Sequence, residues 1–277
     1  MPVLWPLLLL SLATIVLELT DLDTAVCRLF FGGGGDWPML HAQPFHFFYQ
    51  YGSWPGYAIG FAGLLVWLVG LTFDHDLARR GFFCMMLVLL GPGLLVNVVL
   101  KTQVSRPRPC QMIEFGGKAT FQQVFEVPDK TSQQTKLICK SFPSGHASIG
   151  FATLAIPFLL RRKRKLFVVS LGIAISWGLL IGISRVIQGR HFPSDVLWSA
   201  AIIYLLAVAL YYVSGLHRVS PFTATIKRVE TLLSKTANPD APKTIKPWLD
   251  EGHPWNNELG QVNERNRVRS RPAKIAA

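Results

Sequence analysis

Three short pieces of the sequence each gather basic and histidine side chains at the end of an apolar run. The first, KTQVSRPRP, occupies residues 101–109, the second, PSGH, residues 143–146, and the third, SRVIQGRHFPSD, residues 184–195. Charged groups are costly inside lipid and belong at its edge. Together the pieces predict one anion-binding site at a membrane surface.

The first piece carries two cations that suit a phosphoryl group. Lys101 is followed after six residues by Arg108, in a stretch stiffened by Pro107 and Pro109. A guanidinium can hold two phosphate oxygens at once, while an ammonium acts as a compact point charge. Taken alone, the pair is more simply explained by long side chains that reach from a helix end into the membrane interface.

The second piece leaves a turn and enters an apolar run. Ser144 is placed to cap that helix, and a helix start offers free backbone N–H groups to an anion. Gly145 allows the backbone to approach a bound oxygen closely, and His146 can give or take a proton near neutral pH. By itself, PSGH is a common capping string.

The third piece pairs a histidine with a carboxylate. His191 lies just before a helix that Pro193 is suited to begin, and Asp195 falls in the first turn of that helix. A carboxylate there can accept the proton of one ring nitrogen and leave the other nitrogen free to attack. Arg185 adds a third cation. A purely structural hydrogen bond is the simpler alternative for this piece alone.

The composition predicts a membrane protein. Apolar residues make up 50% of the 277 residues, and the mean hydropathy is +0.33. A helix needs roughly 20 mostly apolar residues to cross a hydrocarbon core about 30 Å thick. We therefore predict an all-α polytopic membrane helix bundle with about six transmembrane helices. The six apolar runs are residues 3–19, 55–73, 81–100, 147–160, 166–183 and 196–214.

Two alternatives to this assignment stay open. Buried helices of a large soluble protein would show the same apolar surfaces on all sides. The first run could also be a cleaved signal peptide, but no Lys or Arg precedes it and no clear A-x-A site follows it. We expect a retained anchor.

Basic residues set the expected orientation. The string RRKRK at residues 161–165 fills the turn between the fourth and fifth runs, and cytoplasmic turns carry an excess of Lys and Arg. This places all three motif pieces on the outer side. The membrane domain is then residues 1–214, with outer loops 20–54 and 102–145, and residues 215–277 form a basic cytoplasmic tail.

The outer loops carry two further expectations. Aromatic residues within 37–57 suit the headgroup level, as an interfacial belt or as a surface for lipid entry. Cys110 and Cys139 lie where disulfides persist, and their pairing would stabilise the fold by about 3 to 4 kcal/mol on the entropic model. We predict this pair, with Cys27 as a competing partner. Cys84 lies inside a span and is expected to pack.

Several classes of protein lack support in the sequence. It contains no glycine-rich nucleotide loop and no Cys/His spacing suited to zinc, which argues against an ATP-driven pump and a metallohydrolase. The net charge of +12 is concentrated in the cytoplasmic turn and the tail, where anionic lipids attract it. We therefore expect no nucleic-acid partner.

The three pieces together resemble the signature of the type 2 phosphatidic acid phosphatase superfamily, in which the motifs follow in the order K-x6-R-P, P-S-G-H and S-R-x5-H-x3-D. The resemblance covers the apolar runs from about residue 55 to residue 214. Two successive Arg-Pro pairs compete for the first motif, and the six-residue spacing selects Arg108. We expect Arg106 to be an auxiliary phosphate or headgroup contact. The matching residues are Lys101, Arg108, Pro109, Pro143, Ser144, Gly145, His146, Ser184, Arg185, His191 and Asp195.

The resemblance implies a role for each functional side chain. His191 would be the nucleophile that forms a phosphohistidine, Asp195 would orient it, and His146 would protonate the leaving oxygen and then activate water. No metal or cofactor is expected, because positioning and cationic charge supply what phosphoryl transfer needs. The residues that would hold the phosphoryl oxygens are Lys101, Arg108, Ser144, Gly145 and Arg185.

With a membrane scaffold, the resemblance implies a lipid phosphatase of a bacterial inner (plasma) membrane whose site faces the periplasm or exterior. Candidate substrates are undecaprenyl diphosphate, phosphatidylglycerol phosphate, phosphatidate and the phosphates of lipid A. The expected partners are the lipid phosphate and the surrounding membrane lipids. The alternatives are a lipid phosphotransferase with a lipid diphosphate donor, and a non-enzymatic lipid transporter or scramblase that uses the cations only to bind headgroups.

Overall fold

A computed structural model describes residues 4–124, 126, 140–219, 227, 230, 231 and 234. The chain divides into two units, Met1–Val229 and Glu230–Ala277, and every element below belongs to the first. Apart from two isolated β-bridges, all regular structure in the described ranges is helical. The predicted all-α class is confirmed.

Four described helices are long and apolar enough to cross a membrane: Phe45–Phe73, His75–Gln103, Arg164–Ile187 and Pro193–Val213. A bent pair, α1 (Leu4–Leu19) and α2 (Leu22–Arg28), forms a fifth if counted as one span, with 71° between its halves. Each of the six predicted runs is helical, but the count of about six spans is not confirmed.

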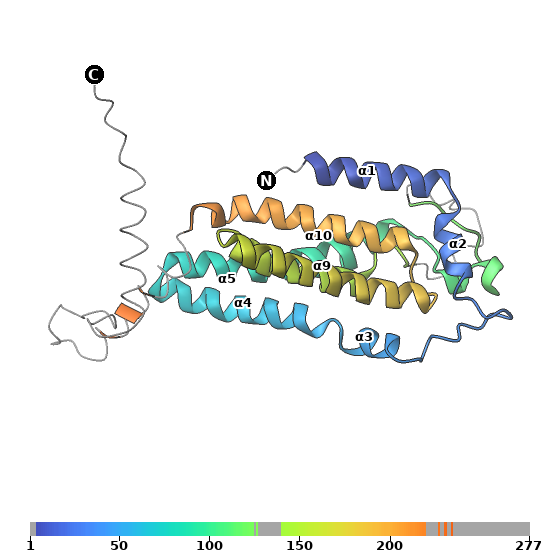
Figure 1. The fold of residues 1–277 in the computed structure, drawn as a ribbon, viewed down its shortest axis with the longest axis horizontal. Coiled ribbons are helices and arrows are strands. Elements are labelled where there is room, and N and C mark those ends of the chain that lie inside the picture. Colours follow the sequence, from blue (N-terminus) through green and yellow to red (C-terminus); the bar gives the residue numbers. More distant parts are fainter. Residues whose placement is uncertain are drawn as a thin grey trace, which may run out of the picture. The chain divides into compact units, whose positions relative to one another are not determined.

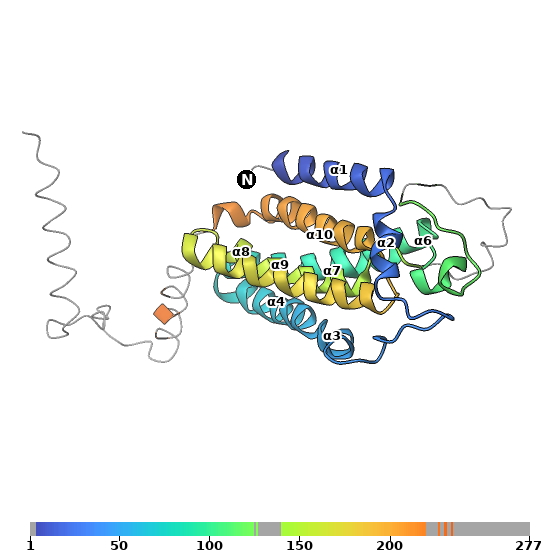
Figure 2. The same ribbon diagram turned by 45° about the vertical axis from the view of Figure 1, so that its right-hand side comes forward.

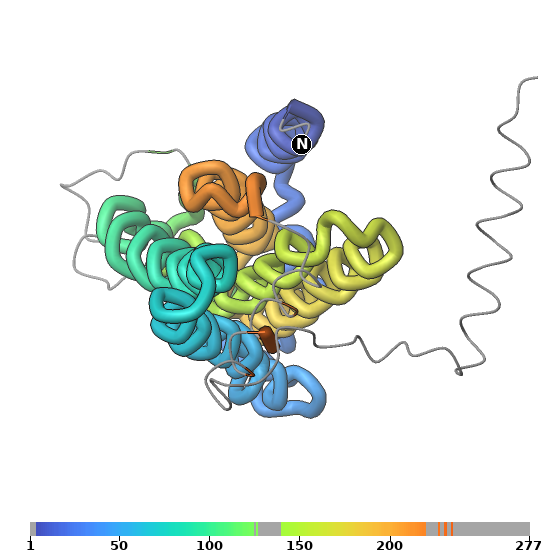
Figure 3. Tube along the Cα trace, turned by 90° about the vertical axis from the view of Figure 1, so that its left-hand side faces the viewer, coloured from blue at the N-terminus to red at the C-terminus, as the bar shows by residue number. Residues whose placement is uncertain are grey.

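The fourth predicted span forms only a short helix, Gly145–Leu160, which is not a candidate membrane span. Its length of about 24 Å falls below the roughly 30 Å of a hydrocarbon core. It comprises α7 (Gly145–Phe151), η5 (Ala152–Leu154) and α8 (Ala155–Leu160), and residues 147–155 are all buried. This segment packs against its neighbours, as the view along the bundle shows (Figure 3). Its apolar composition therefore reflects burial in protein.

The long helices lie side by side along the bundle (Figure 1). They are α4 (Trp54–Phe73), α5 (His75–Val88), α9 (Arg164–Ile187) and α10 (Pro193–Val213). Helix α5 continues into a π-helical segment, η1 (Leu89–Leu100), and then into the short α6 (Lys101–Gln103). Alternating helix directions bring the end of α6, the start of α7, the end of α9 and the start of α10 to one end of the bundle (Figure 2).

Two segments outside the long helices also reach this end. Helix α2 contacts α10, and α3 (Phe45–Tyr51), which carries much of the aromatic sequence, packs against α9. Cys27 on α2 and Cys84 on α5 are buried in the core, as expected for Cys84. Cys139 lies outside the described residues, so the Cys110–Cys139 disulfide stays a prediction.

Candidate active site

The starts of α7 and α10 form the centre of the site, and each has the residue that the sequence predicts at that position. Ser144 is the N-cap of α7, where its Oγ accepts a hydrogen bond from the N–H of Ala147 at 3.4 Å. Pro193 is the first residue of α10. The two starts are joined because Ser199 Oγ donates to the carbonyl oxygens of Ser144, at 3.0 Å, and Asp195, at 2.7 Å.

His191 and Asp195 face each other beneath the surface. Nδ1 of His191 lies 3.5 Å from Oδ2 of Asp195, and the two side chains are 4% and 0% exposed. The same oxygen accepts hydrogen bonds from Ser141 Oγ at 2.5 Å and from the N–H of Phe192 at 2.9 Å. These bonds fix the carboxylate in place and leave it in a long, polar contact with the imidazole.

A tight turn before His191 positions its ring. Gly189 has φ +67°, and a Cβ at this position would lie 2.3 Å from the ring of Trp37. Its carbonyl oxygen accepts a hydrogen bond from the N–H of Cys110 at 3.0 Å. Glycine is the residue that adopts this backbone conformation without strain, so the turn ties His191 to the segment that carries Arg108.

Arg106 corrects one of the sequence-based expectations. Its side chain is 0% exposed, and its guanidinium donates hydrogen bonds to the carbonyl of Gln122, Ser194 Oγ, Asp195 Oδ1 and Asp23 Oδ2 at 2.6 to 2.8 Å. A guanidinium enclosed in this way does not reach a substrate phosphate. The prediction of an auxiliary phosphate contact is wrong, because the first Arg-Pro pair lies inside the protein.

Asp23 completes a buried charge network. Its carboxylate binds Arg106 and also accepts hydrogen bonds from the backbone N–H of Ser194, at 2.9 Å, and from the Ser194 hydroxyl. Arg106 therefore lies between two carboxylates, Asp23 and Asp195. Counted as formal charges, the three side chains carry one net negative charge, whereas Arg106 and Asp195 alone would cancel.

The first motif meets the second at Gly145. Lys101 Nζ donates to Asn97 Oδ1 at 2.7 Å, and Asn97 Nδ2 donates to the carbonyl of Pro92 at 2.6 Å. A Cβ built on Gly145 would lie 2.8 Å from both Lys101 Nζ and Asn97 Oδ1. Glycine at this position allows the lysine to approach the start of α7.

Arg185 is held from two sides. Its Nη1 donates to Gln188 Oε1 at 2.6 Å, and its Cζ lies 4.4 Å from the centre of the Tyr49 ring. The Tyr49 ring also lies 5.2 Å from that of His146. Thus α3, which the sequence predicts only as part of an interfacial aromatic segment, touches a cation and a histidine of the site.

Arg108 and Arg185 keep part of their hydrogen-bonding capacity. Both side chains have a buried Nε without a hydrogen-bond partner among the described residues. An unpaired buried N–H of a guanidinium is costly, and an anion bound between the cations would satisfy it. Lys101 and Arg108 are themselves only half-buried, as a site that admits a ligand requires.

The electrostatics of the two histidines show that the motifs converge. Burial, with further contributions from Arg185, His191, Lys101 and Arg108, lowers the pKa of His146 to about 4. Burial also lowers the pKa of His191, an effect that Asp195 opposes and that Arg185 and Arg108 reinforce. Both rings therefore lie in the field of the same cations.

Sequence reasoning missed four contributors to this site. Asn97 is a single polar residue inside an apolar run, and Asp23 is one of several polar residues after the first run; no spacing marks either of them. Ser141 lies two positions before the PSGH string, and Tyr49 is one of many aromatic residues in its segment. For Arg106, the sequence shows only that two Arg-Pro pairs follow one another. It does not show which of the two arginines is buried.

Comparisons with known proteins agree with the motif signature. Residues 81–218 match the sequence model of the PAP2 superfamily. A lipid A 4'-phosphatase from Francisella tularensis subsp. novicida (strain U112) is 34% identical over 131 residues, which are 47% of this chain and 56% of the relative. A protein with the same name from Rhizobium leguminosarum is 32% identical over 152 residues, 54% of this chain and 62% of the relative.

A phosphatidylglycerophosphatase B from Bacillus subtilis (strain 168) is 30% identical over 131 residues, which are 44% of this chain and 53% of the relative. No solved structure gives a significant match. The chain spans little more than half the length of these curated relatives. The matched segment nonetheless contains all three motifs, from Lys101 to Asp195. This integral membrane protein therefore belongs to the PAP2 superfamily.

Proposed function

We propose that this protein is a lipid phosphatase that hydrolyses a phosphate from a lipid monophosphate or diphosphate through a phosphohistidine. The observation that carries the proposal is the convergence of the three motifs. Lys101 approaches the start of α7 at Gly145, Tyr49 contacts both Arg185 and His146, and the turn before His191 is bonded to the segment of Arg108. Phosphoryl transfer depends on in-line positioning and on cations around the equatorial oxygens. A nucleophile, a proton donor and three cations at one end of a bundle meet those needs.

The phosphoryl group would lie at the start of α7. Lys101, Arg108 and Arg185 supply positive charge, and the two arginines each have a buried Nε ready to donate. The Gly145 N–H at the helix start and the Ser144 hydroxyl complete the binding set. This arrangement stabilises the negative charge of the transferring group without a metal ion.

The reaction proceeds in two steps. His146 takes up a proton when the anionic phosphate binds among the cations. With Nδ1 of His191 directed to Asp195, Nε2 attacks phosphorus, the bond to the lipid oxygen breaks, and His146 gives that oxygen the proton. Neutral His146 then takes a proton from water as the water oxygen attacks phosphorus and the P–N bond breaks. Inorganic phosphate leaves, and both histidines return to their starting states.

The relatives indicate which substrate to test first. Three relatives are named as lipid A 4'-phosphatases, another as a phosphatidylglycerophosphatase and another as an undecaprenyl-diphosphatase. We propose a lipid A-type phosphate as the leading substrate, with the other lipid phosphates as competitors. The site faces the periplasm or exterior and the tail faces the cytoplasm, as the basic turn at residues 161–165 indicates.

Phosphate release from a panel of lipid phosphates in detergent tests the proposal. His191→Ala should lower kcat by at least about a thousandfold, because the attacking group is lost. His75→Ala, at the start of α5 and away from the motifs, is the matched control and should retain activity. Lipid movement that survives in His191→Ala, with no phosphate release by the unmodified protein, would instead identify a transporter. A labelled lipid acceptor would identify a phosphotransferase.

A further inference from the structure

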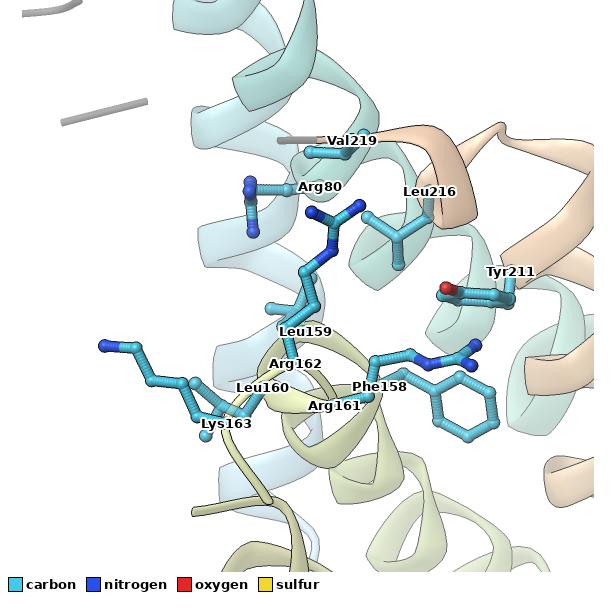
Figure 4. A pocket seen from close by; sticks show the side chains of 10 residues that line it. All are labelled: Arg80, Phe158, Leu159, Leu160, Arg161, Arg162, Lys163, Tyr211, Leu216 and Val219. Atoms are coloured by element: carbon cyan, nitrogen blue, oxygen red, sulfur yellow. The ribbon is translucent and has the colours of Figure 1, made fainter. Parts of the chain in front are cut away.

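A second cluster of cations lines a pocket at the end of the bundle opposite the motifs (Figure 4). Arg80 comes from α5, while Arg161, Arg162 and Lys163 come from the turn between α8 and α9. The pocket has a volume of about 80 Å³. A single buried water needs only about 10 to 15 Å³ in the same measure. There is room for a group of several atoms.

Two of the cations are held in defined positions. Arg161 Cζ lies 4.5 Å from the centre of the Tyr211 ring, and Arg80 is 5% exposed. Figure 4 shows the guanidinium of Arg162 extending toward Arg80 and Leu216. Arg162 is exposed but lies within electrostatic reach of Arg80, so these two like charges are close together at the pocket.

The nearest acidic residues balance only part of this charge. Asp74 and Asp76 attract Arg80. Asp74 also caps its own helix through the N–H groups of Asp76 and Leu77, at 2.7 and 3.2 Å, and Asp76 lies 3.7 Å from Arg79. None of the described residues that line the pocket is acidic. Among the residues that the structure describes, no acidic side chain is paired with Arg161, Arg162 or Lys163, so these three can bind an anion.

The pocket is separated from the catalytic motifs by the length of a membrane span. Helix α9 begins at Arg164, within the basic string, and contains Arg185 in its last turn. Its 24 residues extend about 36 Å at 1.5 Å per residue, slightly more than a hydrocarbon core of about 30 Å. The two cation clusters thus belong to opposite faces of the membrane.

We propose that this pocket binds the phosphate of an anionic phospholipid from the leaflet opposite the catalytic site. Arg161 and Arg162 would hold the phosphate oxygens, and Lys163, whose side chain extends away from them (Figure 4), would add positive charge nearby. Phe158 and Leu159, which also line the pocket, would contact the apolar part of the lipid next to the headgroup. Basic pockets between transmembrane helices bind anionic headgroups in this way. The proposal is independent of the reaction at the other end of the bundle.

Lipid binding to the purified full chain tests the proposal. The fraction of protein carrying a bound phosphatidylglycerol is measured by native mass spectrometry, with phosphatidylcholine and inorganic phosphate as separate additions. Phosphatidylglycerol should bind in preference to both. The double variant Arg161→Gln, Arg162→Gln should bind it about 30-fold more weakly, since each basic residue near an anionic lipid contributes about fivefold.

The matched control is the double variant Arg164→Gln, Lys165→Gln. It removes the same charge from the first two residues of α9, directly after the turn, but neither residue lines the pocket, so it should lose less than about threefold in affinity. An equal loss in the two double variants would overturn the pocket in favour of diffuse attraction. Equal occupancy by inorganic phosphate would overturn the lipid assignment. Melting temperatures in phosphatidylcholine that match the unmodified protein show that both variants are folded.

Discussion

Arg106 connects two carboxylates that are far apart in the sequence: its Nη1 lies 2.7 Å from Oδ1 of Asp195, and its Nη2 lies 2.8 Å from Oδ2 of Asp23. An arginine bound to Asp195 alone would cancel the negative charge that faces His191. Asp23 offsets the arginine from the other side, and Asp195 can then stabilise a cationic histidine. The segment before the PAP2 match thus contributes to the electrostatics of the site.

We predict that Asp23→Asn weakens the nucleophile. Removing one negative charge from the network makes the potential at His191 more positive, which disfavours the positive charge that develops on the ring when it is protonated or attacks phosphorus. The pKa of His191 should fall further, so the acidic limb of the pH–rate profile should move to lower pH. The value of kcat should fall about tenfold, which corresponds to about 1.4 kcal/mol. The measurement is kcat against pH for both proteins.

Asp21→Asn is the control for this substitution, because Asp21 is an exposed carboxylate two residues away. It should change neither kcat nor the position of the acidic limb. A lower kcat in Asp23→Asn with an unmoved limb would show that Asp23 only stabilises the fold, and the electrostatic role would have to be abandoned.

A second prediction concerns Tyr49, whose ring lies 4.4 Å from Arg185 Cζ. A cation near an aromatic ring gains roughly 0.5 to 1 kcal/mol at a partly exposed site. Tyr49→Ala should therefore let Arg185 move and raise KM about fivefold, whereas Tyr49→Phe, which keeps the ring, should stay within about twofold. Kinetics on a lipid phosphate in detergent provide the measurement.

Tyr51→Ala is the matched control because Tyr51 is on the same helix and packs against Phe47, not against Arg185. An equal rise of KM in both alanine variants would mean that α3 affects lipid entry as a whole. In that case the contact between Tyr49 and Arg185 would have no specific role.

The fold was predictable from the sequence to the extent that hydrophobicity reports burial. Each apolar run became a helix because runs of this length satisfy their backbone hydrogen bonds internally. Composition alone, however, does not tell whether an apolar helix is surrounded by lipid or by other helices. Residues 147–155 are enclosed by other helices, which is why a segment too short to be a candidate span has the composition of one.

The candidate site was predictable where a helix end defines the position. Ser144 and Pro193 have strong positional preferences at helix starts, and both were placed correctly. Arg106 and Arg108 follow the same turn chemistry two residues apart, and only tertiary packing decides that the first faces Asp195 and the second keeps an unpaired Nε. The residues next to Arg106 in the sequence do not indicate a partner as distant as Asp23.

A third prediction follows from the lowered pKa of His146, about 4. The ring is neutral at pH 7, the form that can activate water. A bound dianion would offset the surrounding cations and raise this pKa, so binding should take up a proton. Sulfate keeps both charges across this range, and its inhibition constant should fall as pH decreases from 7 to 5, by at most about tenfold per pH unit for one proton.

Inhibition of phosphate release by sulfate, measured at several pH values, gives this slope. His75→Ala should leave it unchanged, while His146→Ala should flatten it, with any remaining slope due to His191. A sulfate inhibition constant that is independent of pH in the unmodified protein would show that the anion does not bind beside His146.

The last prediction concerns metal ions. Lys101, Arg108 and Arg185 already place three positive charges where the phosphoryl oxygens are expected, and such groups stabilise a phosphoryl transition state as metal ions do in other enzymes. Phosphate release should therefore stay within about twofold after dialysis against EDTA, with a magnesium-dependent phosphatase treated in parallel to confirm that chelation is complete. A rate that collapses under EDTA and returns with added magnesium would contradict the cationic mechanism, because the arginines and the lysine would then be unable to supply the charge by themselves.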